Sequence, residues 1–137
     1  MGRFKMKVSL ANHQDVADAR RGMLAMEKVR RIEIDGVVDS GATKLVLPTA
    51  IADQLGLERI GTTGVRYADG RRATRDVVGE VDLTLLGRQS VFTASLEPDR
   101  NTALIGAIVM EELDFLIDCI RGTLYPRDPL TTITEIE

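Results

Sequence analysis

Cysteine, histidine and tryptophan are nearly absent from this chain of 137 residues. It contains one cysteine, Cys119, one histidine, His13, and no tryptophan. Together these shortages exclude a disulfide framework, a structural zinc cluster and, within one chain, a Cys/His or Ser/His/Asp catalytic arrangement. Any catalysis must therefore rest on carboxylates, and we expect neither a metal ion nor a cofactor.

The chain also lacks a strong excess of one charge and a long apolar run. Its 18 basic and 21 acidic residues give a net charge of −3, so no overall field attracts nucleic acid or anionic lipid. Charges at Arg3, Lys5 and Lys7 interrupt the amino-terminal stretch. Its apolar runs are therefore too short for a signal peptide or a membrane span. We expect a cytoplasmic protein with no nucleic-acid or membrane partner.

The length and the apolar content fit one folded domain. Apolar residues make up 44% of the chain and charged residues 28%, values typical of a soluble globular protein. Residues 1–126 are predicted to form this domain, and residues 127–137, which follow Pro126, are predicted to be a carboxy-terminal tail.

Short segments of alternating apolar and polar residues predict many strands. Asp69-Gly70 suits a two-residue hairpin turn, since glycine readily adopts positive φ. Cys119 is expected to be a small buried residue. The strands are expected at residues 4–10, 29–38, 65–68, 71–77, 81–85, 91–95, 103–105, 115–118 and 123–125.

Helical signals are few. Residues 48–55 and 108–113 are predicted to be short helices, and residues 12–28 a loop with a possible helix capped by Asp15. Residues 52–57 weakly match residues 110–115, and each segment follows an apolar strand and a loop that contains glycine. These elements predict a mostly β fold, a closed barrel or a sandwich, with one or two short helices.

The stretch from Val37 to Thr43 is the strongest candidate for chemistry. Asp39 ends an apolar strand and is followed by the small residues Ser40, Gly41 and Ala42. This pattern suits a carboxylate that activates water. A lone ionised carboxylate is a weak base, but two held together share one proton, so one accepts a proton from water while the other donates to a carbonyl.

No second Asp-Ser/Thr-Gly sequence occurs in the chain. Asp35-Gly36 and Asp69-Gly70 lack the hydroxyl residue. The second carboxylate would therefore come from another copy of the chain, related by a two-fold axis. The chemistry predicts a homodimer that cleaves an amide bond.

These residues resemble the retropepsin-like aspartic proteases, in particular their small bacterial and archaeal members. The resemblance extends over residues 6–125. Its most specific element is Val38-Asp39-Ser40-Gly41-Ala42-Thr43, and Ala103-Leu104-Ile105-Gly106 is similar to a second family motif near a carboxy-terminal helix. Arg66-Tyr67-Ala68-Asp69-Gly70-Arg71 lies where the family has its flap, a hairpin that closes over bound peptide.

The resemblance implies a closed β-barrel of the acid-protease type and an aspartic endopeptidase acting on a peptide or protein substrate. It implies catalytic roles for Asp39, Ser40 and Gly41. It implies that substrate binding involves Ala42, Tyr67, Ala68, Asp69, Gly70, Ile105 and Gly106, with Ile105 and Gly106 beside the catalytic loop.

The chain departs from the family at three points, one of which is a tail past Pro126 that is longer than a minimal viral subunit needs. Ser40 replaces the commoner threonine and keeps the hydroxyl, and the flap carries Asp69, Arg71 and Arg72 where viral enzymes have a glycine-rich tip. Two alternatives to an active protease therefore stay open. One is a dimeric peptide-binding or regulatory module that does not hydrolyse, and the other is a monomeric β-barrel interaction domain in which Asp39 is a buried cap.

Overall fold

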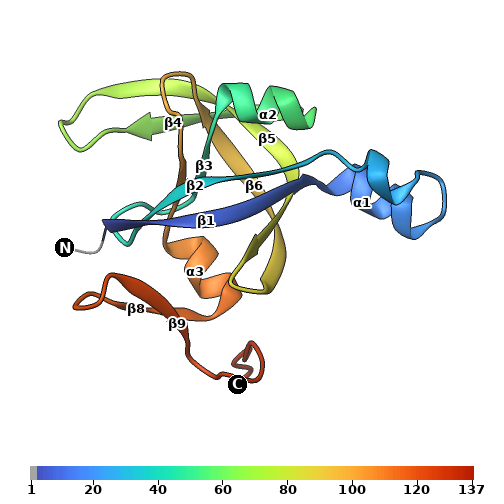
Figure 1. Cartoon of the computed structure of the whole chain (residues 1–137). Coiled ribbons are helices and arrows are strands. Elements are labelled where there is room, and N and C mark those ends of the chain that lie inside the picture. Colours follow the sequence, from blue (N-terminus) through green and yellow to red (C-terminus); the bar gives the residue numbers. More distant parts are fainter. Residues whose placement is uncertain (1–2) are drawn as a thin grey trace.

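The computed structural model describes residues 3–137, about half of which lie in strands. Three short helices accompany them: α1 (His13–Arg20), α2 (Thr49–Leu55) and α3 (Ala107–Leu113). The strands are β1 (Arg3–Asn12), β2 (Arg31–Asp39), β3 (Leu45–Pro48), β4 (Glu58–Arg66), β5 (Arg72–Leu85), β6 (Arg88–Glu97), β7 (Ala103–Ile105), β8 (Phe115–Asp118) and β9 (Thr123–Pro126). Figure 1 shows their arrangement.

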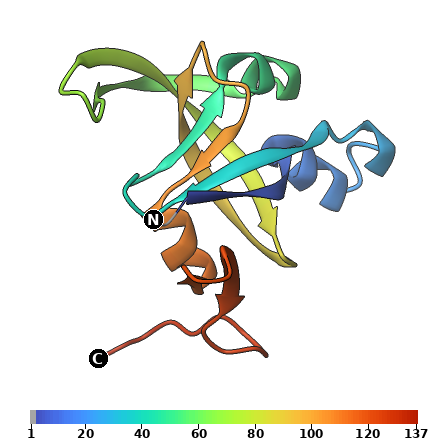
Figure 2. The same ribbon diagram turned by 60° about the vertical axis from the view of Figure 1, so that its left-hand side comes forward.

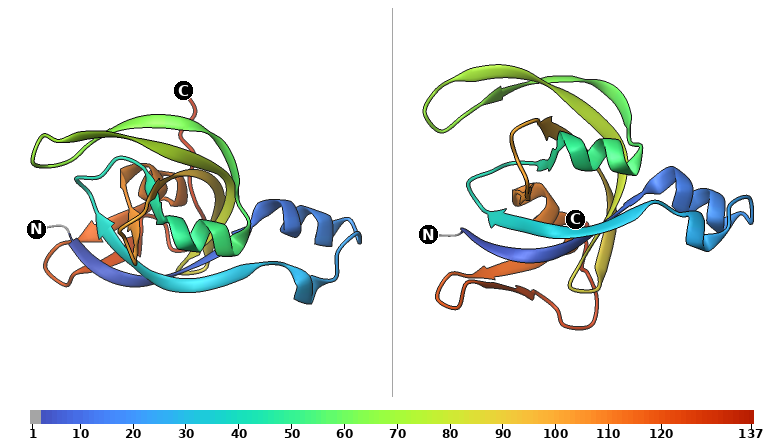
Figure 3. Two further views of the ribbon diagram at one scale, coloured as in Figure 1. Left: turned by 90° about the horizontal axis from the view of Figure 1, so that it is seen from above. Right: turned by 45° about the horizontal axis from the view of Figure 1, so that its top comes forward.

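Six of the strands close into a barrel. The hydrogen-bonded order is β1-β2-β7-β3-β6-β5, and residues 9–12 of β1 pair with residues 81–84 of β5 to complete the ring. The view from above in Figure 3 looks into this ring. The predicted mostly β, closed-barrel fold is thus confirmed. The strand β4 lies outside the ring and pairs with β5, so these two strands project as a hairpin.

Alternation along the strands places one apolar face inside the barrel. Val38, Leu83 and Ile105 are fully buried, while their neighbours along the strands are more exposed. Burial of each large aliphatic side chain contributes about 1.5–3 kcal/mol to the free energy of unfolding. Asp35-Gly36 lies within β2, as the alternation predicts, and a Cβ at Gly36 would meet the side chain of Ile105 at 2.7 Å.

The helices α2 and α3 end in the same way. Gly56 follows α2 with φ of 66° and Asp114 follows α3 with φ of 60°, both in the left-handed conformation. In both segments the last helical leucine and the first large apolar residue after the turn are buried. The weak sequence match between residues 52–57 and residues 110–115 therefore reflects a repeated helix end.

Several expectations for single elements are wrong in detail. The cap of α1 is Asn12, whose side chain accepts from the Asp15 amide, and Asp15 itself binds Arg30. Residues 72–85 form one strand, because β5 continues through an irregularity between Val78 and Val81. Cys119 is exposed, because it lies in the turn between β8 and β9.

The hairpin turn between β4 and β5 is also longer than the two residues expected. Tyr67 and Arg71 still pair through their backbone, so residues 68–70 form the loop. Gly70 adopts φ of 89° there, and a three-residue loop of this type commonly places glycine at that position.

The carboxy-terminal part lies below the barrel (Figure 2). The strands β8 and β9 form a separate two-stranded sheet, and residues 127–137 contain neither helix nor strand. Arg127 pairs with Asp114 at 2.8 Å, and the Ile133 amide donates to Asp114 at 3.0 Å. No helix within residues 3–137 is long and apolar enough to cross a membrane.

Candidate active site

Asp39 is placed by the strand that precedes it. Val38 is fully buried in the barrel, and β2 is held between antiparallel β1 and parallel β7. Asp39 is the last residue of β2, so its carboxylate lies at the edge of the barrel, beyond the buried core. Its side chain is 23% exposed, and Ser40 and Gly41 beyond it are exposed. We call residues 39–44 the Asp39 turn.

Both carboxylate oxygens of Asp39 have neighbours. The Gly41 amide donates a hydrogen bond to Oδ1 at 2.9 Å, and Nε of Arg3 lies 3.3 Å from Oδ2. The Ala42 amide also donates to the backbone carbonyl of Asp39 at 3.1 Å. A Cβ at Gly41 would lie 3.2 Å from Oδ1, so a small residue at this position keeps the approach to the carboxylate open.

The start of α3 supports the Asp39 turn from behind. The amides of Ala107 and Ile108 donate to the carbonyls of Ala42 and Thr43, each at 2.9 Å. Gly106 makes this contact possible, since a Cβ there would lie 2.5 Å from the carbonyl oxygen of Lys44, with further backbone atoms at 2.7 Å. The two sequence motifs, far apart in the chain, therefore form one packed unit.

The projecting hairpin lies above the Asp39 turn on the same side of the molecule (Figures 1 and 3). We call this hairpin, residues 58–77, the flap. Tyr67 Oη donates to Glu97 at 2.6 Å, and Arg75 donates to the other oxygen of Glu97 at 3.2 Å. The hydrogen bond to Glu97, with a smaller contribution from burial, raises the pKa of Tyr67 above its ordinary value. One carboxylate on β6 therefore holds two residues of the flap.

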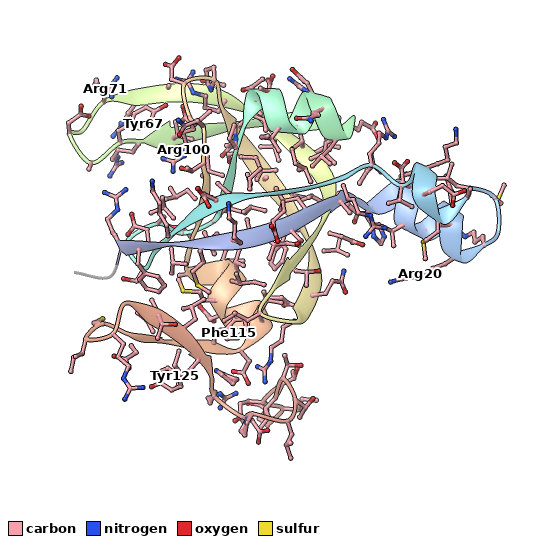
Figure 4. All side chains as sticks on the ribbon, viewed as in Figure 1. Arg20, Tyr67, Arg71, Arg100, Phe115 and Tyr125 are labelled. Atoms are coloured by element: carbon pink, nitrogen blue, oxygen red, sulfur yellow. The ribbon has the colours of Figure 1, made fainter. Side chains whose placement is uncertain are left out.

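A cavity of about 440 Å³ separates the Asp39 turn from the flap. Figure 4 shows the side chain of Tyr67 at the flap and that of Arg100 just beneath it, above the strands that carry the turn. We call this cavity the cleft. It is lined by Gly41, Ala42, Thr43, Lys44, Val46, Thr63, Gly64, Val65, Arg66, Tyr67, Ser95, Glu97, Arg100 and Leu104.

The structure brings some of the predicted site residues together and not others. Gly41, Ala42 and Tyr67 line the cleft, and Asp39 and Ser40 adjoin it in the same turn. Residues 68–70 lie at the exposed end of the flap, outside the lining. Ile105 and Gly106 are buried behind the Asp39 turn, and Leu104 occupies the wall instead.

Three residues at the site carry no local sequence signal. Arg3 reaches Asp39 because β1 and β2 pair with Arg3 opposite Asp39. Glu97 and Arg100 reach the cleft from the end of β6 and the loop after it. Contacts between residues 30 or more positions apart cannot be read from periodicity, although the place of residues 97–102 just before the second motif marks them as near the site.

Comparisons with known proteins agree with this geometry. A family profile described as "Aspartyl protease" matches residues 28–109. No curated protein matches the chain. Among solved structures, the EIAV protease complexed with the inhibitor HBY-793 is similar, with a TM-score of 0.58, 16% identity, and coverage of 81% of this chain and 88% of that chain. The simian foamy virus (mac) protease has a TM-score of 0.46 and 21% identity, with coverage of 59% and 84%.

The matched region contains both sequence motifs, the flap and most of the barrel, and it spans more than half of the chain. The chain therefore belongs to the aspartyl protease family. The EIAV protease shares its fold, so the retropepsin-like barrel expected from the sequence is confirmed.

Proposed function

We propose that the protein is a homodimeric aspartic endopeptidase whose active site combines Asp39 from each of two subunits. The observation that carries this proposal is a single Asp-Ser-Gly turn at the edge of a retropepsin-like barrel, beneath a flap. Within residues 3–137, Asp39 is paired with Arg3 and hydrogen-bonded to Gly41, and no second carboxylate accompanies it. A two-fold axis beside the turn supplies the missing acid.

In the proposed reaction the two Asp39 carboxyl groups share one proton. The ionised one removes a proton from a water molecule, whose oxygen attacks the peptide carbonyl carbon, while the protonated one donates to the carbonyl oxygen. The tetrahedral intermediate then collapses: the carboxyl group that took the water proton gives it to the leaving amine as the carbon–nitrogen bond breaks, and a hydroxyl of the intermediate returns a proton to the other carboxylate. The Gly41 amide orients one carboxylate oxygen, and Ser40 would hydrogen-bond across the pair.

In the single chain, Arg3 lies beside the Asp39 carboxylate, where the proposed mechanism needs the second Asp39. The Nε atom of the Arg3 guanidinium lies 3.3 Å from Oδ2 of Asp39. The side chain of Arg3 is 62% exposed, so it can move away at little cost when a second Asp39 approaches.

The proposed peptide-binding role of the flap rests on its position. Substrate in extended form would pass between the Asp39 turn and the flap, where β-strand backbone can pair with it. The flap end at residues 68–70 would close over it. Ile105 and Gly106 would act through the turn they support rather than by touching peptide.

The decisive experiment uses Asp39→Asn. We expect this variant to form the dimer but to lose cleavage of a peptide library by at least about 10³-fold, because neither subunit can then supply the acid and base pair. Asp35→Asn is the matched control, since Asp35 lies in the same strand but pairs with Lys7 at the surface. Equal turnover by Asp39→Asn contradicts the proposed mechanism.

Mixing the subunits tests the shared site directly. An excess of Asp39→Asn protein should inhibit the wild type far more than dilution does, because mixed dimers contain one acid only. An excess of Asp35→Asn should not inhibit. Sedimentation that shows monomers at high concentration contradicts the proposal, and a dimer that binds peptide without cleaving it indicates instead a silent binding module, which the Arg3–Asp39 pair favours.

A further inference from the structure

The charge of the cleft differs from the charge of the chain. The whole chain carries a net charge of −3, but the cleft is lined by Lys44, Arg66 and Arg100 against the single acid Glu97. Glu97 is already bound by Arg75 and by the hydroxyl of Tyr67. The wall that faces the substrate is therefore cationic.

The cleft cations differ from the neighbouring arginines of the flap. Arg71 pairs with Asp69 at 2.7 Å and Arg75 with Glu97 at 3.2 Å, so these flap charges are neutralised locally. Within the part of the chain that the structure describes, Lys44, Arg66 and Arg100 have no carboxylate within 4.0 Å. No salt bridge neutralises them, and Arg100 interacts with the carboxylates of Glu97 and Asp39 only at longer range, so all three cations can bind a ligand.

Arg100 is the most restrained of the three. Its Nε donates to the carbonyl oxygen of Thr102 and its Nη2 to the Thr102 hydroxyl, both at 3.0 Å. These bonds fix the guanidinium plane, and Nη1 has no hydrogen-bond partner among residues 3–137. Burial, and then the nearby charge of Arg3, lower the pKa of Arg100, although an arginine stays charged at neutral pH.

We propose that the cleft selects peptides that carry an acidic side chain close to the scissile bond, with the carboxylate bound by Arg100. Lys44 and Arg66 add long-range attraction for the same charge. The proposal rests on the proposed peptidase function. A fixed, half-buried guanidinium forms charge-assisted hydrogen bonds with a carboxylate, and it stays uncompensated when a neutral side chain takes that place.

The test compares matched peptides. Fluorogenic peptides that differ only by glutamate or glutamine, at each position beside the cleaved bond in turn, are assayed for kcat/KM with the full-length protein. At one position we expect about a tenfold preference for glutamate, which corresponds to about 1.4 kcal/mol. The preference should fall as ionic strength rises, since salt screens the partly exposed cations.

Variants assign the preference to the cleft. In Arg100→Gln the ratio of kcat/KM values for the two peptides should fall to about one, and in Lys44→Gln it should fall partly. Arg20→Gln removes an arginine on α1, at the far end of the molecule from the flap (Figure 4), and should leave the ratio unchanged. If Arg100→Gln does not fold, as checked by thermal unfolding, the Lys44→Gln and Arg66→Gln proteins provide the same comparison.

Binding separates this inference from the peptidase proposal. The same peptides are titrated onto the Asp39→Asn protein by fluorescence anisotropy. Preferred binding of the glutamate peptide without any cleavage by the wild type supports the acidic selectivity and contradicts the peptidase. Cleavage with no preference between glutamate and glutamine, or no binding of either peptide, overturns the selectivity, as does displacement of bound peptide by a single-stranded oligonucleotide at lower concentration than by the acidic peptide.

Discussion

The Asp39 turn and the flap face each other across the cleft, but different contacts hold them. The turn is fixed by backbone hydrogen bonds to Ala107 and Ile108 and by buried strands beneath it. The flap is largely exposed and is tied to the barrel through side chains, chiefly Tyr67 and Arg75 on Glu97. The turn therefore has one available position, whereas the flap can open when a few side-chain contacts break, among them the pair of Arg59 with Asp53 of α2 at 2.7 Å.

The strongest test of this contrast is Gly106→Ala. The new methyl group would lie 2.5–2.7 Å from backbone atoms of Thr43 and Lys44, which cannot rotate away. We expect a loss of about 3 kcal/mol in the free energy of unfolding, measured in urea, together with loss of peptide cleavage. Gly61→Ala in the flap is the control, because its Cβ meets nothing within 4 Å. Equal effects of the two substitutions contradict the contrast.

A smaller loss of stability is expected from a substitution at Asp15, which lies away from the cleft. Asp15 binds the guanidinium of Arg30 at 2.8 and 3.0 Å and its amide at 3.0 Å, which joins α1 to the residue that precedes β2. Asp15→Asn should cost about 2 kcal/mol in the free energy of unfolding, because charge-assisted hydrogen bonds to Arg30 are lost. The kcat/KM for a good peptide should stay within about twofold, and a large fall would show that this distant pair also shapes the cleft.

The same pair predicts a dependence on pH. The hydrogen bond from Arg30 lowers the pKa of Asp15 below its ordinary value. A carboxyl whose pKa is lower in the folded state stabilises the fold above its unfolded value of about 3.9, and this contribution is lost as the pH falls through the folded pKa. Between about pH 5 and pH 2 the wild type should therefore lose more stability than Asp15→Asn, as followed by urea unfolding. Parallel curves contradict this assignment.

The smallest stability effect is expected in the flap. Glu97→Gln weakens the bonds to Tyr67 and Arg75, and should raise KM severalfold while changing the unfolding free energy by less than about 1 kcal/mol. The pKa of Tyr67 should also fall toward its ordinary value, since its bond to Glu97 raises it. Ultraviolet titration resolves this because the chain has only two tyrosines. An unchanged tyrosine titration would show that the two side chains do not pair in solution.

The sequence predicts the Asp39 turn better than the flap, because local patterns define the turn whereas distant contacts define the flap. The end of β2 at Asp39 follows from the alternation of apolar and polar residues, and the end of α2 follows from Gly56. Both are local patterns, so the sequence predicts both positions. The flap depends on Tyr67 meeting Glu97, 30 positions away, and on a loop one residue longer than the Asp-Gly pair indicates. Such features arise from tertiary packing.

The sequence also does not predict the pairing of Arg3 with Asp39. Nothing in the residues near Arg3 indicates that it lies opposite Asp39, since the register of β1 on β2 follows from the burial of Val8 and Leu10. Cys119 shows the opposite failure. Its apolar neighbours Ile117 and Ile120 indicated burial, but the residue occupies a turn that projects from the small β8–β9 sheet.

The backbone bonds between the Asp39 turn and α3 also set an order of events during synthesis. The carbonyl groups of Ala42 and Thr43 accept from the amides of residues 107 and 108, so in a growing chain on the ribosome the acidic loop lacks this support until most of the barrel has been made. Long-range pairings of this kind slow folding, because a large loop must close before the contact is gained. The site proposed to bind peptide thus forms among the last steps of folding.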